Sequence, residues 1–218
     1  MHLMGFRCNV AALALILAAT IAGRAVAGES VKLPERSEQS GMDLFSALSL
    51  RLSTRSFDSG RKLSDTMVSD LLWAALGVNR EDGRRTIPFS YDLRVVKVFL
   101  ATESGCFLYV PEANELLPVS DLDVRSVIFK QEEFLSAPVS LVFVYDSDKE
   151  SGTKEYQVEL AEAHISVGAA MQNVQLAAAA FGLGTVAVTS IRPDRIASLL
   201  KVDEEDHVIL AMPVGYPK

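Results

Sequence analysis

The sequence predicts an α+β domain in which a mostly antiparallel central sheet is flanked by helices. Segments with helical periodicity alternate with segments rich in β-branched and aromatic residues. Two strand-like segments are joined by the turn over residues 111–114, which predicts a hairpin. One much longer helical segment, over residues 155–181, is expected to form the centre of the domain. About 190 residues follow a cleavable N-terminal segment, a length that suits one domain.

The elements before the sheet are two helices preceded by a polar leader. Residues 28–41 are polar, charged and aperiodic, which predicts a flexible leader over 28–45 and a single domain over 46–218. Helical periodicity covers residues 43–52. The second helix is better marked, because Ser64 offers an N-cap and Gly77 can close the C-terminus. Its apolar face consists of Val68, Leu71, Leu72 and Ala75.

The remaining segments predict the sheet and one more short helix. That helix begins at Pro193, because proline favours the first helical position. The wholly apolar segment 139–145 is expected to be a central strand. Strands are predicted over residues 93–101, 107–110, 116–119, 139–145, 185–188 and 207–214.

The long helix over residues 155–181 consists mostly of Ala, Gly, Val and Leu after Ile165. A membrane span is disfavoured, because Gln172, Asn173 and Gln175 would leave unpaired amides in lipid. Small residues at many turns let other helices approach closely. The helix is therefore expected to be central, buried on two sides, and packed with one face against a second copy of the chain.

The first 27 residues have the pattern of a cleavable export signal. Arg7 supplies the positive end, residues 10–21 form the apolar core, and an A-x-A pattern precedes Gly28. Cleavage removes Arg7 and Arg24 but no acidic residue, which leaves 19 basic and 28 acidic residues and a net charge of −9. A periplasmic or secreted protein is expected. The acidic balance argues against nucleic acid and anionic membrane surfaces as partners.

Cysteine and histidine positions give no sign of a disulfide or a metal site. Cys8 leaves with the signal, so Cys106 has no partner for an internal disulfide. Its strand context predicts a buried apolar side chain and not a reactive thiol. Neither His164 in the long helix nor His207 before the last strand has other ligands at metal-binding spacing.

The segment Arg51-Leu52-Ser53-Thr54-Arg55 carries the clearest chemical signal. It places two guanidiniums and two hydroxyls within five residues of an acidic chain. Guanidiniums present paired donors that match a phosphate or a carboxylate, and a hydroxyl adds a third donor. Such a cluster at the junction of a helix and a loop predicts a site for one phosphate group. The alternative is a solvated basic loop, the ordinary state of exposed arginines.

Several short motifs follow one another along the chain. They are Arg51-x-Ser53-x-Arg55-x-Phe57, Leu63-Ser64, Leu71-Leu72-Trp73-Ala74-Ala75-x-Gly77-Val78-Asn79-Arg80, Gly83-x-Arg85-Thr86-x-Pro88, Leu108-Tyr109-x-Pro111, Ala137-Pro138-Val139, Gln172-Asn173, Gly182-Leu183-Gly184 and Val214-Gly215-Tyr216-Pro217. In this order and spacing the chain resembles the nitroreductase-like family of FMN-dependent oxidoreductases. The likeness is closest to its short branch, which includes relatives of thiazoline/oxazoline dehydrogenases.

The resemblance implies a homodimer with FMN at the subunit interface and no catalytic side-chain acid or base. It implies ping-pong transfer of electrons or hydride from NAD(P)H or another reductant to a small nitro-, quinone- or enone-like acceptor. The arginines and Ser53 would take the FMN phosphate and ribityl chain, and backbone N–H groups of residues 188–190 would face the flavin ring. The residues at cofactor-binding positions are Arg51, Leu52, Ser53, Arg55, Pro88, Asp92, Val188, Thr189, Ser190 and Lys218.

Three features depart from the family pattern. Phe89 and Tyr91 stand near positions that are commonly small, and they would narrow the pocket. Asp92 replaces an asparagine, so a possible donor becomes an acceptor only. Lys218 leaves at most one cation where relatives have a longer basic extension. The alternative is therefore a non-enzymatic member of the fold with weak or lost flavin binding, which acts as a binding or structural module.

Overall fold

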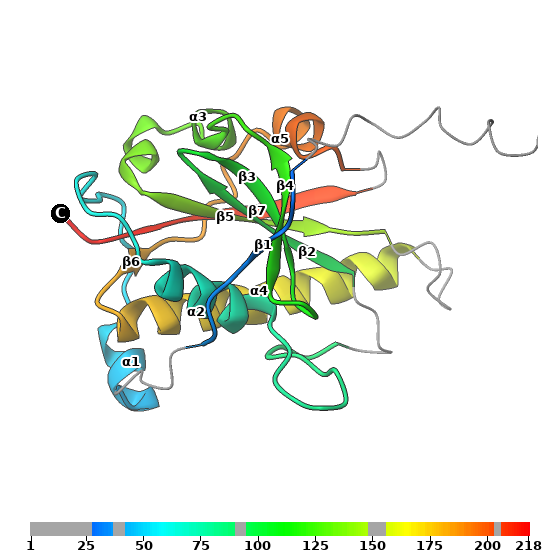
Figure 1. The fold of residues 1–218 in the computed structure, drawn as a ribbon, viewed down its shortest axis with the longest axis horizontal. Helices are drawn as coiled ribbons and strands as arrows, with labels where there is room; N and C mark the ends of the chain where they lie inside the picture. The colour runs from blue at the N-terminus through cyan, green and yellow to red at the C-terminus, as the bar shows by residue number, and fades with distance from the viewer. Residues whose placement is uncertain (1–27, 37–41, 90–94, 148–155, 203–205) are drawn as a thin grey trace, which may run out of the picture.

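The computed structural model describes residues 28–36, 42–89, 95–147, 156–202 and 206–218, and it confirms the predicted α+β fold (Figure 1). In these ranges one sheet of seven strands has the order β1-β4-β3-β2-β5-β7-β6. Every neighbouring pair is antiparallel. The strands are β1 (Val31–Lys32), β2 (Val96–Thr102), β3 (Gly105–Val110), β4 (Glu115–Ser120), β5 (Val139–Tyr145), β6 (Gly184–Thr185) and β7 (His207–Gly215).

Helices cover both faces of this sheet (Figure 1). One face carries α2 (Asp65–Leu76) and the long α4 (Tyr156–Ala180), with α1 (Leu44–Leu50) packed beside α4. The opposite face carries α3 (Arg125–Ile128), the 3₁₀-helix η2 (Glu132–Ser136) and α5 (Pro193–Leu200). The molecule thus has three layers, with the sheet in the middle.

Successive side chains of the central strands point to opposite faces of the sheet, so the core has two parts. In β2, Val98 and Leu100 point into the core shared with α2 and α4, whereas Phe99 and Ala101 point into the core shared with α3 and α5. All seven residues of β5 are buried, because helices cover both of its faces and strands flank both of its edges. The apolar segment 139–145 was therefore interpreted correctly as a central strand.

Capping residues set the helix boundaries as expected. The hydroxyl of Ser64 accepts a hydrogen bond from the N–H of Met67 at 3.2 Å and caps α2. Pro193 begins α5. The helix predicted over 155–181 is α4, and none of the described helices has the length and apolarity that a membrane crossing requires. Cys106 is buried, and burial raises the pKa of its thiol to about 12, as its strand context predicted.

Three local expectations were wrong. A leader without regular structure was expected over 28–45, but Val31–Lys32 forms β1 on the edge of β4, and Leu33 is buried in the core. A two-residue strand is too short to show a period in sequence. The helix predicted over 43–52 ends at Leu50, because the chain after it pairs with β6. The strand predicted over 185–188 stops at Thr185, because the continuous pairing with β7 ends there and is followed in the described residues by an isolated bridge between Val188 and Ala211.

Candidate functional site

The basic segment after α1 lies beside β6 and the C-terminal residues, as the cyan stretch next to the C-terminus shows (Figure 1). The N–H of Thr54 donates to the carbonyl of Thr185 at 3.0 Å. The N–H of Lys218 donates to the carbonyl of Ser56 at 3.2 Å. These backbone bonds bring together three segments that are far apart in sequence, and they place Lys218 beside the arginine cluster.

Close packing fixes the segment in this position. Gly184 is required here, because a Cβ atom on it would lie 2.4 Å from the Thr54 hydroxyl oxygen. Phe57 is only 2% exposed and packs into the core on the α3 and α5 side. With Thr54 and Phe57 turned inward, Ser53 and Arg55 lie at the surface. The fold therefore presents the hydroxyl and the second arginine to solvent on a rigid support.

Arg51 is held by the neighbouring helices. Its N–H ends α1 by donating to the carbonyl of Ala47 at 2.9 Å. Its guanidinium Nη1 donates to Oε1 of Gln175, a buried residue of α4, at 3.4 Å. The other N–H groups of the Arg51 guanidinium can donate to another acceptor. Within the described residues, none of Arg51, Arg55 and Lys218 takes part in an ion pair.

The segment assigned to the flavin ring follows β6 directly. The N–H of Val188 donates to the carbonyl of Ala211 at 2.9 Å, so this N–H is already engaged in pairing with β7. Thr189 and Ser190 are exposed, and in the part of the chain that the structure describes their N–H groups make no backbone hydrogen bond. Of the three residues implied by the resemblance, only these two offer free backbone donors.

Pro88 lies elsewhere on the molecule. Its carbonyl accepts a hydrogen bond from the hydroxyl of Ser166 on α4 at 3.2 Å. Ser166 and Gln175, which contacts Arg51, are nine positions apart on this helix, about 14 Å along its axis and half a turn around it. One chain therefore does not bring Pro88 to the arginine cluster. Asp92 and Tyr91 lie outside the described residues.

Sequence reasoning missed the residues that support the cluster. Gln175 orients Arg51, and the contact of Thr54 with Gly184 holds the segment against β6. The signal for Gln175 was present, since amides interrupt an otherwise apolar helix. Its neighbour Asn173 has a structural role, because its amide donates to the carbonyls of Ala74 at 3.1 Å and Thr86 at 3.3 Å. The pairing of residue 54 with residue 185 has no local signal.

The donor set fits a phosphate group. Two guanidiniums, one ammonium and one exposed hydroxyl lie on neighbouring segments, and oxyanions are the ligands that donors of this kind bind. Two guanidiniums provide planar donor pairs, and the ammonium adds a point charge. Leu52, which is 62% exposed, contributes apolar surface beside them.

Comparison with known proteins identifies the family of the chain. The model of the Nitroreductase family matches residues 48–216. A curated protein of Methanocaldococcus jannaschii assigned as a nitroreductase is 31% identical over 198 residues, which cover 85% of this chain and 95% of that protein. A crystal structure from Ralstonia eutropha jmp134, also assigned as a nitroreductase, is 33% identical with a TM-score of 0.80 and covers 87% of this chain and 90% of that chain.

A more distant structure shows the same fold. The NADPH:FMN oxidoreductase of Vibrio harveyi, solved in complex with NAD+, is 19% identical with a TM-score of 0.59 and covers 80% of this chain and 69% of that one. The family match and the relatives above 30% identity support an oxidoreductase in general. The extent of the match, together with the shared sheet and helices, shows that the chain belongs to the nitroreductase family.

Proposed function

We propose that the protein is an FMN-dependent oxidoreductase that takes electrons or hydride from NAD(P)H or another reductant and passes them to a small nitro-, quinone- or enone-like acceptor. The observation that carries the proposal is the cluster of unpaired cations at residues 51, 55 and 218 on the rigid edge beside β6. FMN supplies the redox chemistry when it is bound. The electron donor and the electron acceptor occupy the same site one after the other.

The chain's own residues bind and orient the cofactor in this proposal. The Arg51 fork, steadied by Gln175, and the Arg55 guanidinium hold the phosphate, with Ser53 and Lys218 as further donors. The free N–H groups of residues 189 and 190 face the ring, where oriented donors stabilise negative charge. No side-chain acid or base is needed.

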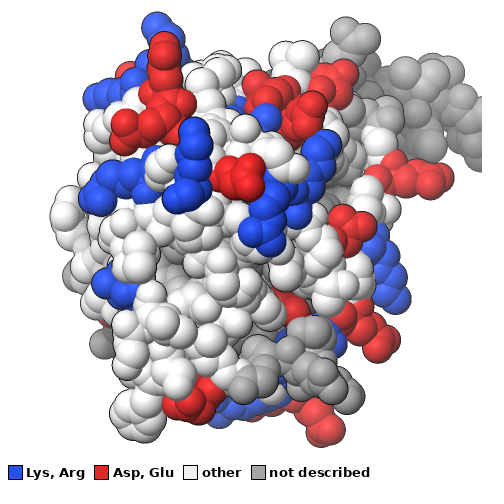
Figure 2. Space-filling view, turned by 90° about the vertical axis from the view of Figure 1, so that its left-hand side faces the viewer, with Lys and Arg blue, Asp and Glu red and all other residues white. Residues whose placement is uncertain are grey.

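We further propose that the working form is a homodimer. Pro88 and Arg51 contact α4 half a turn apart, so a second copy packed on α4 would bring Pro88 of one copy toward the cations of the other. An exposed apolar surface is available for this contact. Figure 2 shows Lys and Arg side chains in the upper half of one face and a broad area without charged side chains below them. Exposed apolar side chains lie on α1, with one more just after it, and they are Leu44, Phe45, Leu48, Leu50 and Leu52.

The phosphate role of Arg51 is tested by replacing it. Hydrogen bonds to charged groups contribute roughly 1.5–3 kcal/mol, so Arg51→Ala should weaken FMN binding about 10- to 100-fold. Arg51→Lys keeps the positive charge but loses the paired N–H donors of the guanidinium, so its affinity for FMN should lie between those of the wild type and Arg51→Ala. The measurement is a titration of FMN into flavin-free protein, followed by the quenching of flavin fluorescence.

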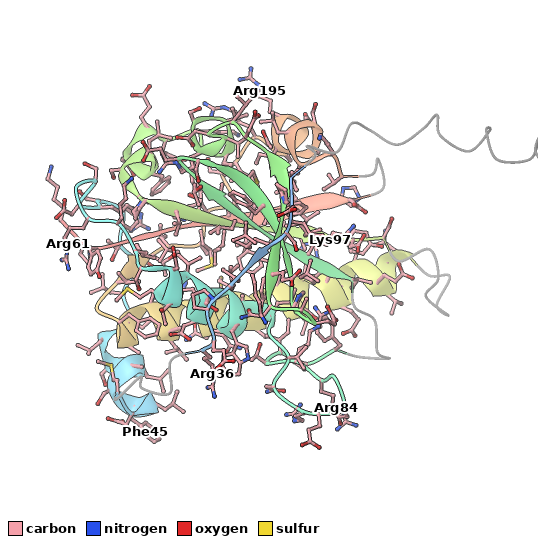
Figure 3. The ribbon with its side chains drawn as sticks, in the orientation of Figure 1. Arg36, Phe45, Arg61, Arg84, Lys97 and Arg195 are labelled. Atoms are coloured by element: carbon pink, nitrogen blue, oxygen red, sulfur yellow. The ribbon has the colours of Figure 1, made fainter. Side chains whose placement is uncertain are left out.

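Riboflavin, which lacks the phosphate, is the ligand control and should bind the wild type and Arg51→Ala alike. Arg195→Ala, on α5 at the upper edge of the molecule in Figure 3, is the protein control and should leave FMN affinity unchanged. Equal FMN affinity in the wild type and Arg51→Ala would show that the cluster is a solvated basic loop and not a phosphate site.

The protein is also proposed to be exported and cleaved before Gly28. The basis is the n-region at Arg7, the apolar core and the A-x-A pattern. N-terminal sequencing of protein recovered from outside the cytoplasm should begin near residue 28. Recovery with residues 1–27 still attached would contradict cleavage.

A further inference from the structure

A hollow lies in the loop after α2, away from the cation cluster. It has a volume of about 530 Å³. Figure 3 shows Arg84 in this loop at the lower edge of the molecule, whereas the C-terminal segment lies at the left. Among the described residues, those that line it are Arg80, Asp82, Gly83, Arg84, Arg85, Ile87, Pro88 and Phe89. The lining therefore combines three arginines with three apolar residues.

The loop that forms the pocket is tied into the fold. Gly83 makes its tight turn with φ +79°, and the N–H of Gly83 donates to the carbonyl of Arg80 at 3.0 Å. The N–H of Asn79 donates to the carbonyl of Arg84 at 3.0 Å, which closes a small hairpin. The indole N–H of Trp73 on α2 donates to the carbonyl of Val78 at 3.0 Å. The arginines are thus mounted on a preformed support, which lowers the ordering cost of binding.

Arg85 is the buried member of the set. Its side chain is 8% exposed, and its Nη2 donates to Oε1 of Glu112 at 2.5 Å. Its Nε is buried and has no hydrogen-bond partner in the part of the chain that the structure describes. Its guanidinium carbon lies 5.8 Å from the centre of the Phe89 ring. A buried donor without an acceptor is unfavourable, so the guanidinium of Arg85 is only partly satisfied in this structure.

The two exposed arginines leave donors open toward the same hollow. Arg84 shares only its Nε with Asp82, at 3.4 Å. Arg80 takes part in no ion pair among the described residues. With Glu112, which pairs with Arg85, the pocket carries three positive charges and two negative charges, a local excess of one positive charge in a chain whose net charge is −7. This local excess attracts an anion.

We propose that this pocket binds the oxyanion group of a substrate that also has a planar, apolar body. The arginines provide paired donors for a carboxylate or phosphate, and Ile87, Pro88 and Phe89 provide apolar contact for a ring. The inference rests on the proposed function in one respect: Pro88, at the rim, is also the residue that the resemblance places at the flavin. An acceptor anchored by its anionic end in this pocket would lie with its ring toward that position.

The probes are 4-nitrobenzoate and 4-nitrobenzamide, which have nearly the same shape but differ in charge. Isothermal titration of each into the full chain should show the benzoate binding at least about tenfold more tightly, as one charge-assisted hydrogen bond implies. Arg80→Gln and Arg84→Gln should each reduce benzoate affinity and leave benzamide affinity unchanged. Both side chains are exposed, so neither change removes a buried contact. 4-Nitrophenyl phosphate distinguishes a phosphate preference from a carboxylate preference.

The matched control is Arg195→Gln, because Arg195 is an exposed residue of α5 at the opposite edge of the molecule in Figure 3. This variant should bind 4-nitrobenzoate as tightly as the wild type does. Equal affinity for benzoate and benzamide in the wild type would overturn the proposal. So would a benzoate affinity that survives the combined Arg80→Gln and Arg84→Gln change. The proposed function is tested separately. If the chain binds 4-nitrobenzoate through these arginines but does not bind FMN, the pocket proposal stands and the proposed flavin-dependent function is wrong.

Discussion

At the scale of single residues, the site depends on one close approach. Gly184 faces Thr54, and a Cβ atom on Gly184 would lie within 2.4–2.6 Å of three side-chain atoms of Thr54. Gly184 does not have a positive φ, so the requirement for glycine is steric. The segment carrying Ser53 and Arg55 would have to move away from β6 to accept a methyl group there. Small size at residue 184 therefore holds the cation cluster in place.

Gly184→Ala should lower the free energy of unfolding by about 1–3 kcal/mol, the usual cost of overpacking. The measurement is urea unfolding followed by circular dichroism. The double variant Thr54→Gly with Gly184→Ala removes all three clashing atoms. The loss caused by Gly184→Ala should then be smaller in the Thr54→Gly background than in the wild type. An equal loss in both backgrounds would show that this contact is not the cause.

At the scale of elements, an ion pair fastens α3 to the start of β5. Asp123 accepts hydrogen bonds from Nε of Arg125 at 2.8 Å and from its Nη2 at 2.6 Å. Nη1 of Arg125 donates to the carbonyls of Ala137 at 2.9 Å and Pro138 at 3.1 Å. The hydrogen bonds from Arg125 lower the pKa of the Asp123 carboxyl below its ordinary value. Asp123 thus orients the arginine that holds the turn before the central strand.

This pair should make stability depend on pH on the acid side. Because the pKa of Asp123 is lower in the folded state, its contribution is present above the ordinary pKa of aspartate, about 3.9, and is lost as pH falls below it. Asp123→Asn should therefore be less stable than the wild type at pH 7, and the difference should shrink toward pH 2. Urea unfolding midpoints between pH 2 and pH 7 measure this.

The control for this experiment is Asp121→Asn, an exposed acid two positions away. It should leave the pH profile of the unfolding midpoint unchanged. If the gap between wild type and Asp123→Asn is the same at pH 2 as at pH 7, the carboxylate is not the group responsible.

At the scale of the whole molecule, α4 separates the loop with Pro88 from the arginine cluster. The loop with Pro88 and the segment with Arg51 contact this helix about 14 Å apart and on opposite sides. Exposed apolar side chains on α1 and Ile165 of α4, which is 60% exposed, remain without cover in one chain. The proposed homodimer would cover this exposed apolar surface.

Phe45→Glu should therefore convert the proposed homodimer into a monomer. Phe45 is 77% exposed and points outward from α1 at the lower left of Figure 3, so a charge there leaves the single chain folded but opposes burial against a second copy. Light scattering measures the mass, and circular dichroism confirms the fold.

Leu122→Glu is the matched control, because Leu122 is 61% exposed outside α1 and α4. Its mass should stay that of the wild type. A wild-type protein that is monomeric at working concentrations with flavin bound would remove both the dimer and the shared site.

The sequence by itself was sufficient for the features that depend on neighbours in the chain. Periodicity identified α2, the wholly apolar segment 139–145 identified β5, and one long helical segment identified α4. The N-cap at Ser64 and the proline at 193 located two helix starts. The cluster at Arg51 and Arg55 was recognised from residue chemistry alone. The order of motifs was also enough for the family, because a family pattern is itself a property of sequence.

Only the tertiary structure decided which of those residues meet. The pairing of Thr54 with Thr185 and of Ser56 with Lys218 joins segments that are far apart in sequence, and no local propensity encodes such contacts. The same reason explains why β1, two residues long, was missed. The separation of Pro88 from Arg51 also follows from where each packs on α4, since the pitch of that helix and not the spacing in sequence sets their distance.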